Sequence, residues 1–429
     1  MNKQNIQKTL VLLPTSALLA GCLDATDNPA NKITPTPNAD GKYNIIFITT
    51  DQEAYMEQYP AGSDYAARER LRQMGTTFEK HYACANVSTS SRSVIYTGRH
   101  ITETCMLDNT NYAFVNDMSR DLPTVGDMLR DAGYYTAFKG KWHISEDTES
   151  LEEYGFSDWT EGDMYGSVWE GYKEDGTIAD HAIDWLKNKG KQLNNDGQSF
   201  FLAVNFLNPH DIMYFNETPG TYIAGEATPA PDDPVYKKSY NVPVPASWNE
   251  SFDKPGRPAA HKEYNKQWQD WVGPSPTDST GWHTFRDYYF NTIQDEDNHM
   301  LVLLKYLEKA GLLNNSIVIY TSDHGEMQGE HGLKGKGGNI YENNIHVPLI
   351  IYHPEMKGGR HCYNLTSHLD LAPTFVDIAT AGNVQQFSAI TQELHGHSLM
   401  PAVKNPATDI RNSEGALFCF EMISMIAGD

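Results

Sequence analysis

Polar side chains that could bind a cation stand directly after two apolar runs of this sequence. Asp51 and Gln52 follow the first run, and Asp323 and His324 follow the second. Carboxylate, amide and imidazole groups are hard oxygen and nitrogen ligands that suit one divalent cation of the Ca, Mg or Mn type. Taken singly, each residue could have an ordinary structural role, such as a helix cap or a hydrogen-bonded core side chain. Their combination predicts a metal site.

A second set of side chains could bind a tetrahedral oxyanion through positive charge and hydrogen-bond donors. Ser88 opens a polar run that we expect to enter a short helix ended by Gly98. A hydroxyl at that point would lie at a helix N-terminus, where free amides and the helix dipole favour anionic ligands. The basic members of the set are Arg92, Lys141, His143, His210 and Lys336.

These groups must be positioned by a sheet, because the sequence alternates strand-like and helix-like segments. The strand-like segments are apolar and rich in β-branched residues, as in strands buried on both faces, and they are 44–50, 135–138, 201–207, 317–320 and 348–352. Apolar residues at helical spacing predict helices over 123–133 and 285–310. The alternation predicts an α/β fold with a large, mostly parallel sheet between helices. Ligands of such sheets bind beyond the carboxyl ends of the strands.

The stretch 211–283 breaks this alternation. It contains ten of the 22 prolines and four tryptophans, Trp248, Trp268, Trp271 and Trp282. Its aromatic content excludes a disordered linker, so we predict ordered loops packed over the sheet. The tryptophans could stack on sugar rings, although tryptophans in long loops serve more often as packing anchors.

The composition excludes several classes of protein. The chain has 429 residues, of which 39% are hydrophobic and 21% charged, as is typical of a globular protein. Its 33 Lys and Arg against 56 Asp and Glu give a net charge of −23, which argues against a nucleic-acid partner, because phosphate binding needs a basic surface. Five cysteines without CxxC spacing exclude a disulfide-rich scaffold and argue against a structural zinc site.

The first 22 residues are interpreted as an export signal. A short apolar run, too short to span a bilayer as a helix, ends in Leu-Ala-Gly-Cys at Cys22. This end resembles the lipobox of bacterial lipoproteins and implies a lipid anchor on Cys22, while cleavage as an ordinary signal peptide is the alternative. Residues 23–42 are interpreted as a flexible tether. Leu23, in place of the Asp of inner-membrane retention signals, favours the outer membrane or periplasm of a Gram-negative bacterium.

Several motifs in one order resemble the sulfatase family of the alkaline phosphatase superfamily. The family signature is Cys or Ser, any residue, Pro, Ser, Arg, four residues and Thr-Gly. Residues 88–98 follow it in register, with Ser-Thr-Ser-Ser-Arg at 88–92 and Thr-Gly at 97–98. Residues 140–143, Gly-Lys-Trp-His, are similar to the second signature. Residues 321–326, Thr-Ser-Asp-His-Gly-Glu, and the later Lys336 are similar to the metal-binding strand end and the loop beyond it. The resemblance covers about 43–405 and implies a sulfatase-like α/β domain.

The resemblance implies a modified nucleophile and a cation. Ser88 would be oxidised to formylglycine by a formylglycine-generating maturase, and the aldehyde hydrate would attack the sulfur of a sulfate ester. A plain serine lacks the second hydroxyl, whose deprotonation expels the bound sulfate. One divalent cation, with calcium preferred over magnesium or manganese, would lower the pKa of the hydrate. Its ligands would be Asp51, Gln52, Asp323, His324 and the modified Ser88.

The resemblance also implies roles for the basic residues. Arg92, Lys141 and His143 would orient and deprotonate the hydrate. Lys336 and His210 would bind the sulfate, and His210 would also protonate the leaving alcohol.

Two departures from the family pattern leave alternatives open. Serine, not the commoner cysteine, stands at position 88, so only maturases that accept serine could modify it. Ser90 replaces the usual Pro or Ala, and this change weighs against recognition by those maturases. An unmodified Ser88 could act as a direct nucleophile, as serine does in alkaline phosphatases, or could mark an inactive chain. The second departure concerns the C-terminus. We expect a catalytic domain over 43–405 with a loop-rich insertion at 211–284, and a C-terminal small sheet, begun by 406–429, that is truncated or reduced.

Three functions therefore remain to be compared. The first is hydrolysis of a sulfated small molecule or oligosaccharide by an exported lipoprotein. The second is hydrolysis of phosphate or phosphonate esters on the same fold, and the third is binding of sulfated glycans without catalysis. Between Ile144 and Tyr172 stand nine acidic residues and no Lys or Arg. If this acidic segment borders the site, it should slow the approach of highly sulfated substrates at low salt.

Overall fold

The computed structural model describes residues 33–110, 115–146, 149–384 and 394–420. The export signal 1–22, with Cys22, and the tether up to residue 32 lie outside these described residues. Within the described ranges, no helix combines the length and the apolar character needed to cross a membrane.

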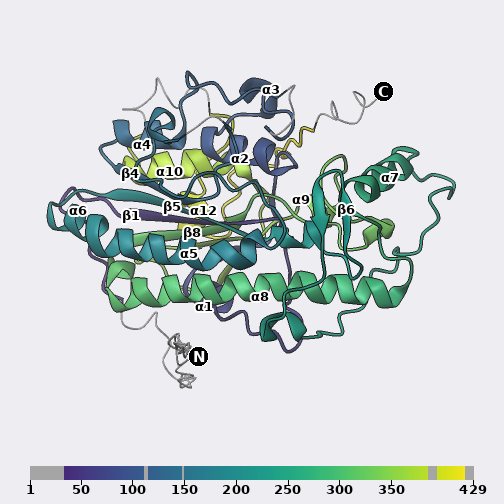
Figure 1. Ribbon diagram of the computed structural model, residues 1–429. Helices are drawn as coiled ribbons and strands as arrows, with labels where there is room; N and C mark the ends of the chain where they lie inside the picture. Colours follow the sequence, from purple (N-terminus) through teal and green to yellow (C-terminus); the bar gives the residue numbers. More distant parts are fainter. Residues whose placement is uncertain (1–32, 111–114, 147–148, 385–393, 421–429) are drawn as a thin grey trace, which may run out of the picture.

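A seven-stranded sheet forms the centre of the molecule (Figure 1). In spatial order its strands are β10 (Arg360–Cys362), β2 (Thr76–Phe78), β9 (Leu349–Tyr352), β8 (Ser316–Ser322), β1 (Asn44–Asp51), β5 (Phe200–Pro209) and β4 (Tyr135–Gly140). Neighbouring strands are parallel except at β9, which is antiparallel to both β2 and β8. The predicted α/β fold with a mostly parallel sheet is confirmed, and all five predicted strands are present.

The strand β1 shows why this sheet needs helices on both faces. All eight of its residues are buried. Because side chains alternate along a strand, Ile45 and Phe47 enter the core on one face, while Ile46 and Ile48 enter the core on the other. Each face is then closed by apolar helix stripes, as expected for a parallel sheet.

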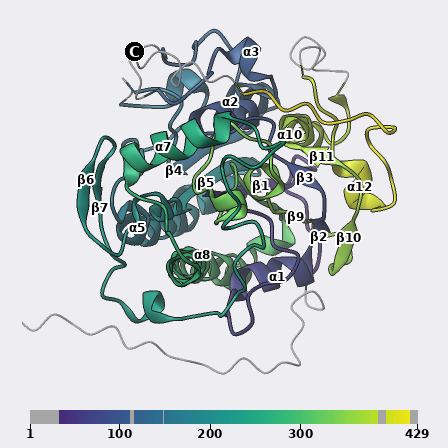
Figure 2. The same ribbon diagram turned by 90° about the vertical axis from the view of Figure 1, so that its right-hand side faces the viewer.

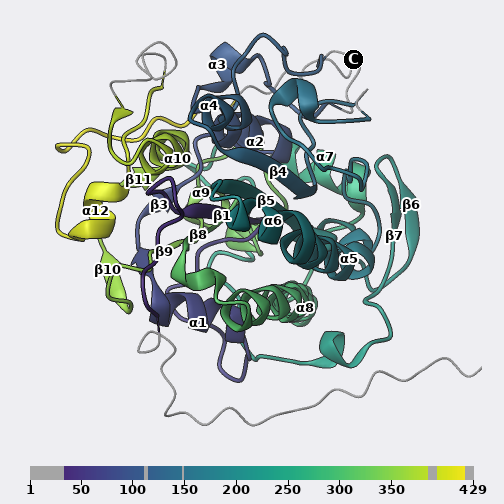
Figure 3. The same ribbon diagram turned by 90° about the vertical axis from the view of Figure 1, so that its left-hand side faces the viewer.

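Two layers of helices enclose the sheet, as Figures 2 and 3 show from its two ends. One layer shares the core of Ile45 and Phe47 and consists of α2 (Ser88–Thr97), α4 (Val125–Asp131), α10 (Leu371–Ala379) and α12 (Met400–Lys404). The other layer shares the core of Ile46 and Ile48 and consists of α1 (Ala66–Met74), α5 (Glu170–Trp185), α6 (Lys191–Asn195) and α8 (Ser279–Lys309). A π-helical turn at Leu186–Gly190 joins α5 to α6.

The remaining short elements lie outside these layers. They are the strand pairs β3 (His81–Tyr82) with β11 (Thr366–Ser367) and β6 (Gly220–Tyr222) with β7 (Gly225–Ala227), and the helices α3 (Ile101–Thr104), α7 (Ala260–Val272) and α9 (Glu342–Ile345).

The insertion 211–284 is more regular than predicted. It contains the 13-residue helix α7, and α8 begins at Ser279 rather than near 285. The earlier start of α8 has a local cause, because the Asp278 side chain accepts a hydrogen bond from Gly281 N and caps the helix. Figure 1 shows α7 and β6 beyond the end of the sheet rather than over its face. Trp268 and Trp282 are buried as packing anchors.

The segment after residue 405 forms no strand within 406–420, the part that the structure describes. It nevertheless contacts the domain. Cys419 N donates to Cys84 O at 2.9 Å, and a Cβ built on Gly337 would lie 3.5 Å from the ring of Phe420.

Candidate active site

The carboxyl ends of four neighbouring strands bring candidate residues to one edge of the sheet. β1 and β8 pair in register up to their ends, so Asp51 and Asp323 leave the sheet side by side. β5 pairs with the other side of β1, and β4 with β5, which brings His210 and Lys141 to the same edge. The predicted position of the site beyond the strand ends follows from this topology.

Ser88 lies at the centre of the group. It is the first residue of α2, a helix whose ten residues are all buried, and Gly98 ends that helix in the left-handed conformation. Ser88 Oγ lies 3.2 Å from each carboxylate oxygen of Asp51, 3.1 Å from His324 Nε2 and 3.2 Å from Lys336 Nζ. One hydroxyl is thus within hydrogen-bond distance of a carboxylate, an imidazole and an ammonium.

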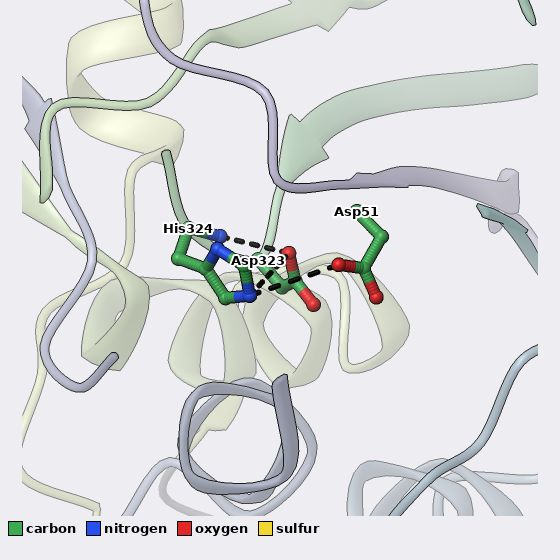
Figure 4. Close-up of side chains that lie close together, drawn as sticks. All are labelled: Asp51, Asp323 and His324. Atoms are coloured by element: carbon green, nitrogen blue, oxygen red, sulfur yellow. Dashed lines mark hydrogen bonds and ion pairs between the residues drawn. The ribbon is translucent and has the colours of Figure 1, made fainter. Parts of the chain in front are cut away.

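Asp51, Asp323 and His324 form a buried group that could hold a metal ion (Figure 4). One ligand atom from each residue lies within 4.8 Å of the others. His324 Nε2 is 3.7 Å from Asp51 Oδ1 and 3.6 Å from Asp323 Oδ1. Burial lowers the pKa of His324 to about 4, so the imidazole is neutral at pH 7, the form that binds metals.

Two further observations fit a cation at this point. His324 Nδ1 lies 3.1 Å from Gly325 O, which can only accept, so Nδ1 carries the proton and the lone pair of Nε2 faces two carboxylates. A cation between these groups would be attracted by the lone pair and by both carboxylates. In addition, Gln52 Oε1 is buried without a hydrogen-bond partner, while Gln52 Nε2 donates to Glu326 at 2.5 Å. Four of the five predicted ligands, Asp51, Gln52, Asp323 and His324, therefore fit a divalent cation that prefers oxygen and nitrogen ligands.

Three cationic side chains surround Asp51. Lys141 Nζ lies 2.8 Å from Asp51 Oδ2, Arg92 Nη2 lies 3.2 Å from the same oxygen, and Lys336 Nζ lies 3.7 Å from Oδ1. Arg92 Nε also contacts Asp323 Oδ2 at 3.0 Å. Burial alone would raise the pKa of Asp51, but the charges of Lys141 and Lys336 outweigh it and hold that pKa well below its usual value. Burial lowers the pKa of Lys336 to about 8.

His143 and His210 complete the predicted set. Burial, together with the neighbouring Lys141, Lys336 and other cations, lowers the pKa of both imidazoles well below the usual value. Both ring nitrogens of His143 and Nδ1 of His210 are buried without a hydrogen-bond partner. Thr89 Oγ1 donates to His143 O at 2.7 Å, which fixes His143 beside the start of α2. Neutral imidazoles with unpartnered ring nitrogens are suited to accept or donate a proton.

The insertion 211–284 positions Lys336. Tyr264 Oη, on α7, donates to Lys336 O at 2.7 Å and to Lys334 O at 3.2 Å. A Cβ built on Gly335 would lie 2.5 Å from Trp268, so the loop lies flat against that indole. The tryptophans are evident in the sequence, but no sequence pattern predicted that the insertion contacts the loop that carries Lys336.

Asp163 is a site-forming residue that the sequence analysis did not single out. Its carboxylate accepts hydrogen bonds from the backbone N–H groups of Trp142 (3.0 Å), His143 (2.8 Å) and Met164 (2.9 Å). Asp163 was one of nine acidic residues in the segment 144–172, and no local pattern distinguished it. Glu326, which accepts a hydrogen bond from Gln52, is the last residue of the 321–326 motif, and the motif alone did not predict this contact.

Comparison with known proteins agrees with this geometry. A family model described as Sulfatase matches residues 43–381. The chain belongs to the sulfatase family. As a member of it, the protein is a sulfuric ester hydrolase. The predicted resemblance is thereby confirmed at the level of the family.

Curated relatives and solved structures cover most of the chain. An N-acetylglucosamine-6-O-sulfatase of Bacteroides thetaiotaomicron is 27% identical over 92% of this sulfatase and 75% of its own length. The human N-acetylglucosamine-6-sulfatase is 25% identical, with 90% and 67% covered. A solved structure described as a complex with D-glucosamine-2-N,6-O-disulfate has a TM-score of 0.70 at 25% identity, covering 89% of this chain and 84% of that one. A phosphonate monoester hydrolase from Silicibacter pomeroyi shares the fold, with a TM-score of 0.63 at 21% identity and coverages of 86% and 78%.

Proposed function

We propose that this sulfatase removes sulfate from a sulfated carbohydrate, with Ser88 as the site of the nucleophile and one divalent cation beside it. The observation that carries the proposal is the position of Ser88 Oγ, within 3.2 Å of Asp51, His324 and Lys336 at once. The carbohydrate class is supported by the relatives, which are described as N-acetylglucosamine sulfatases, and by the structural relative with a bound glucosamine disulfate.

The proposal includes two groups added to the chain. Oxidation of the Ser88 side chain to formylglycine removes two hydrogen atoms and, after hydration of the aldehyde, gives two hydroxyls at this position instead of one. A cation bound by Asp51, Gln52, Asp323 and His324 would supply positive charge beside those hydroxyls, and calcium suits this oxygen-rich set.

The chain's own residues would perform the remaining steps. Lys336 has its ammonium 3.2 Å from Ser88 Oγ and would bind sulfate oxygens as a point charge. Lys141 and Arg92 keep Asp51 ionised and fixed in place. The neutral ring of His143 has unpartnered nitrogens and would accept a proton from the nucleophile.

His210 would provide the proton for the leaving alcohol. In the structure its Nδ1 has no partner, and burial, together with nearby Lys336 and Lys141, disfavours the charged imidazolium. A bound sulfate ester is negatively charged, so its arrival raises the affinity of His210 for a proton. Bound substrate thus favours the protonated form of His210, which is the form that can donate to the leaving alcohol.

The test is mass spectrometry combined with turnover. We expect the tryptic peptide 81–92, from protein made with a serine-accepting maturase, to lack two hydrogen atoms at Ser88. Such protein should hydrolyse N-acetylglucosamine 6-sulfate and lose activity with a chelator, while Ser88→Ala should be inactive. Faster hydrolysis of aryl phosphates than of aryl sulfates, or full activity of Ser88→Ala, would contradict the proposal.

We further propose that the protein is exported and anchored by a lipid on Cys22. The support is the apolar run that ends in Leu-Ala-Gly-Cys. In a Gram-negative host, the wild-type chain should fractionate with the outer membrane and Cys22→Ser should not. Equal fractionation of both would contradict the anchor.

A further inference from the structure

A short segment of the acidic region lies against the candidate catalytic residues. This segment, Asp163–Gly166, is called the 163–166 strap. Lys141 Nζ, which contacts Asp51 at 2.8 Å, also donates to Tyr165 O at 3.1 Å. Thus a single ammonium group separates the backbone of Tyr165 from the proposed cation site.

The end of the strap lies flat against His210. Gly166 has φ +89°, and a Cβ built on it would lie 2.2 Å from Cε1 of His210. Gly166 O accepts a hydrogen bond from Tyr214 Oη at 3.0 Å, and Gly166 N donates to Glu170 at 2.6 Å. The backbone on both sides of the Tyr165 side chain is therefore fixed.

The ring of Tyr165 borders the site and is accessible. Its centroid lies 5.3 Å from that of His143, with the planes at 73°. Tyr165 is 39% exposed and is one of the few large apolar side chains that the described residues expose. Among those, it is the one whose ring contacts a candidate catalytic residue.

The direction of the substrate follows from the proposed mechanism. The sulfate must lie at Ser88 and Lys336, and the ester oxygen must lie within reach of His210 or His143. Because the strap lies against both histidines, a carbon skeleton that leaves the site beside them meets the strap. The apolar C–H face of a pyranose ring packs well on an aromatic ring, and the fixed strap lowers the entropic cost of that contact.

We propose that Tyr165 forms a stacking subsite for the pyranose ring that carries the scissile sulfate and no other charged group. This inference rests on the proposed function and names the substrate group that contacts this chain. The charges of the strap and its neighbours favour a ring without a second anionic group. Glu170 accepts from Gly166 N and Ser167 N, and Asp163 accepts from His143 N, so two carboxylates flank the tyrosine and would repel a second sulfate there.

Binding of two ligands tests the subsite without turnover. The probes are N-acetylglucosamine 6-sulfate and inorganic sulfate, measured by calorimetry on calcium-loaded protein made without maturase. We expect Tyr165→Leu to weaken binding of the sugar sulfate about five- to tenfold and to leave binding of inorganic sulfate within about twofold. Tyr165→Phe keeps the ring and should bind the sugar sulfate like the wild type. All three chains keep the backbone carbonyl that Lys141 contacts.

A matched control is Tyr363→Leu, which alters another exposed tyrosine, 66% accessible, near β10. It should change neither affinity. Equal affinity of wild type and Tyr165→Leu for the sugar sulfate overturns the subsite and leaves the proposed function standing. Absence of binding of both probes to the wild type refutes the proposed function together with the subsite. A parallel loss of sulfate binding in Tyr165→Leu would show a disturbed site and would also overturn the stacking role.

Discussion

Removal of the Asp163 carboxylate should displace His143. His143 has φ +57°, a left-handed conformation that costs a non-glycine residue about 1–3 kcal/mol. Asp163 opposes that cost, because its oxygens accept from the N–H groups of His143 at 2.8 Å, Trp142 at 3.0 Å and Met164 at 2.9 Å. In Asp163→Ala these three donors lose their acceptor, and the backbone at His143 is free to relax.

The size of the effect follows from the number of donors. A buried donor without a partner costs about 1–3 kcal/mol. Because Asp163 is only half-buried, water replaces part of the lost bonding, and we expect Asp163→Ala to lower the free energy of unfolding by about 2–4 kcal/mol. The turnover number should fall about 100-fold, since a displaced His143 no longer serves as a base, while KM changes little.

Urea unfolding and steady-state kinetics on maturase-treated protein measure both effects. Asp163→Asn retains one acceptor oxygen and should recover part of the stability and of the turnover. Glu153→Ala is the matched control, because Glu153 is an exposed carboxylate of the same acidic segment, paired with Arg120. The reasoning is refuted if Asp163→Ala unfolds within about 0.5 kcal/mol of the wild type with an unchanged turnover number.

Three further perturbations have defined outcomes. Gly166→Ala places a Cβ 2.2 Å from His210 and should abolish most sulfatase activity, whereas Gly162→Ala, also at positive φ but with no atom within 4 Å, should keep it. Burial raises the pKa of Glu296 from 4.5 to about 8, so the folded chain keeps a proton that the unfolded chain releases, and the free energy of unfolding should fall as pH rises from 4.5 to about 8. Glu296→Gln should flatten that fall in urea unfolding curves. Added salt should raise kcat/KM for a highly sulfated substrate from its low-salt value, and a steady decrease would contradict the placement of the acidic segment at the site.

The sheet was predictable because its strands are buried on both faces. Continuous apolar runs such as 44–50 are typical of such strands. Because neighbouring strands pair in parallel, the polar residues that follow them lie at the same edge of the sheet. The pattern did not reveal strand direction, so the antiparallel β9 was not foreseen. It also did not reveal α7, because the prolines of 211–283 outweighed the helical spacing of a short amphipathic segment.

The site was predictable where its residues stand in motifs at strand ends, and not where they approach from elsewhere. Asp51 and Asp323 are set by β1 and β8, which local patterns identify. Asp163 and Tyr165 lie in a loop about 20 residues after β4. Their hydrogen bonds to the site involve backbone atoms on one side, which place no demand on neighbouring residue types. Tyr264 supports Lys336 across more than 70 residues of chain. Such contacts arise from tertiary packing and leave no periodicity in the sequence.

The charges of the site explain how an acidic protein can bind an anionic group. Three cations, Arg92, Lys141 and Lys336, face the two carboxylates of Asp51 and Asp323, so these five side chains together carry one net positive charge. A divalent cation would raise this to three, enough to hold one sulfate. The chain as a whole carries −23, and two carboxylates of the acidic segment, Asp163 and Glu170, reach the edge of the site. We therefore expect attraction to be confined to short range, where one sulfate ester enters, and chains with many sulfates to be repelled at longer range.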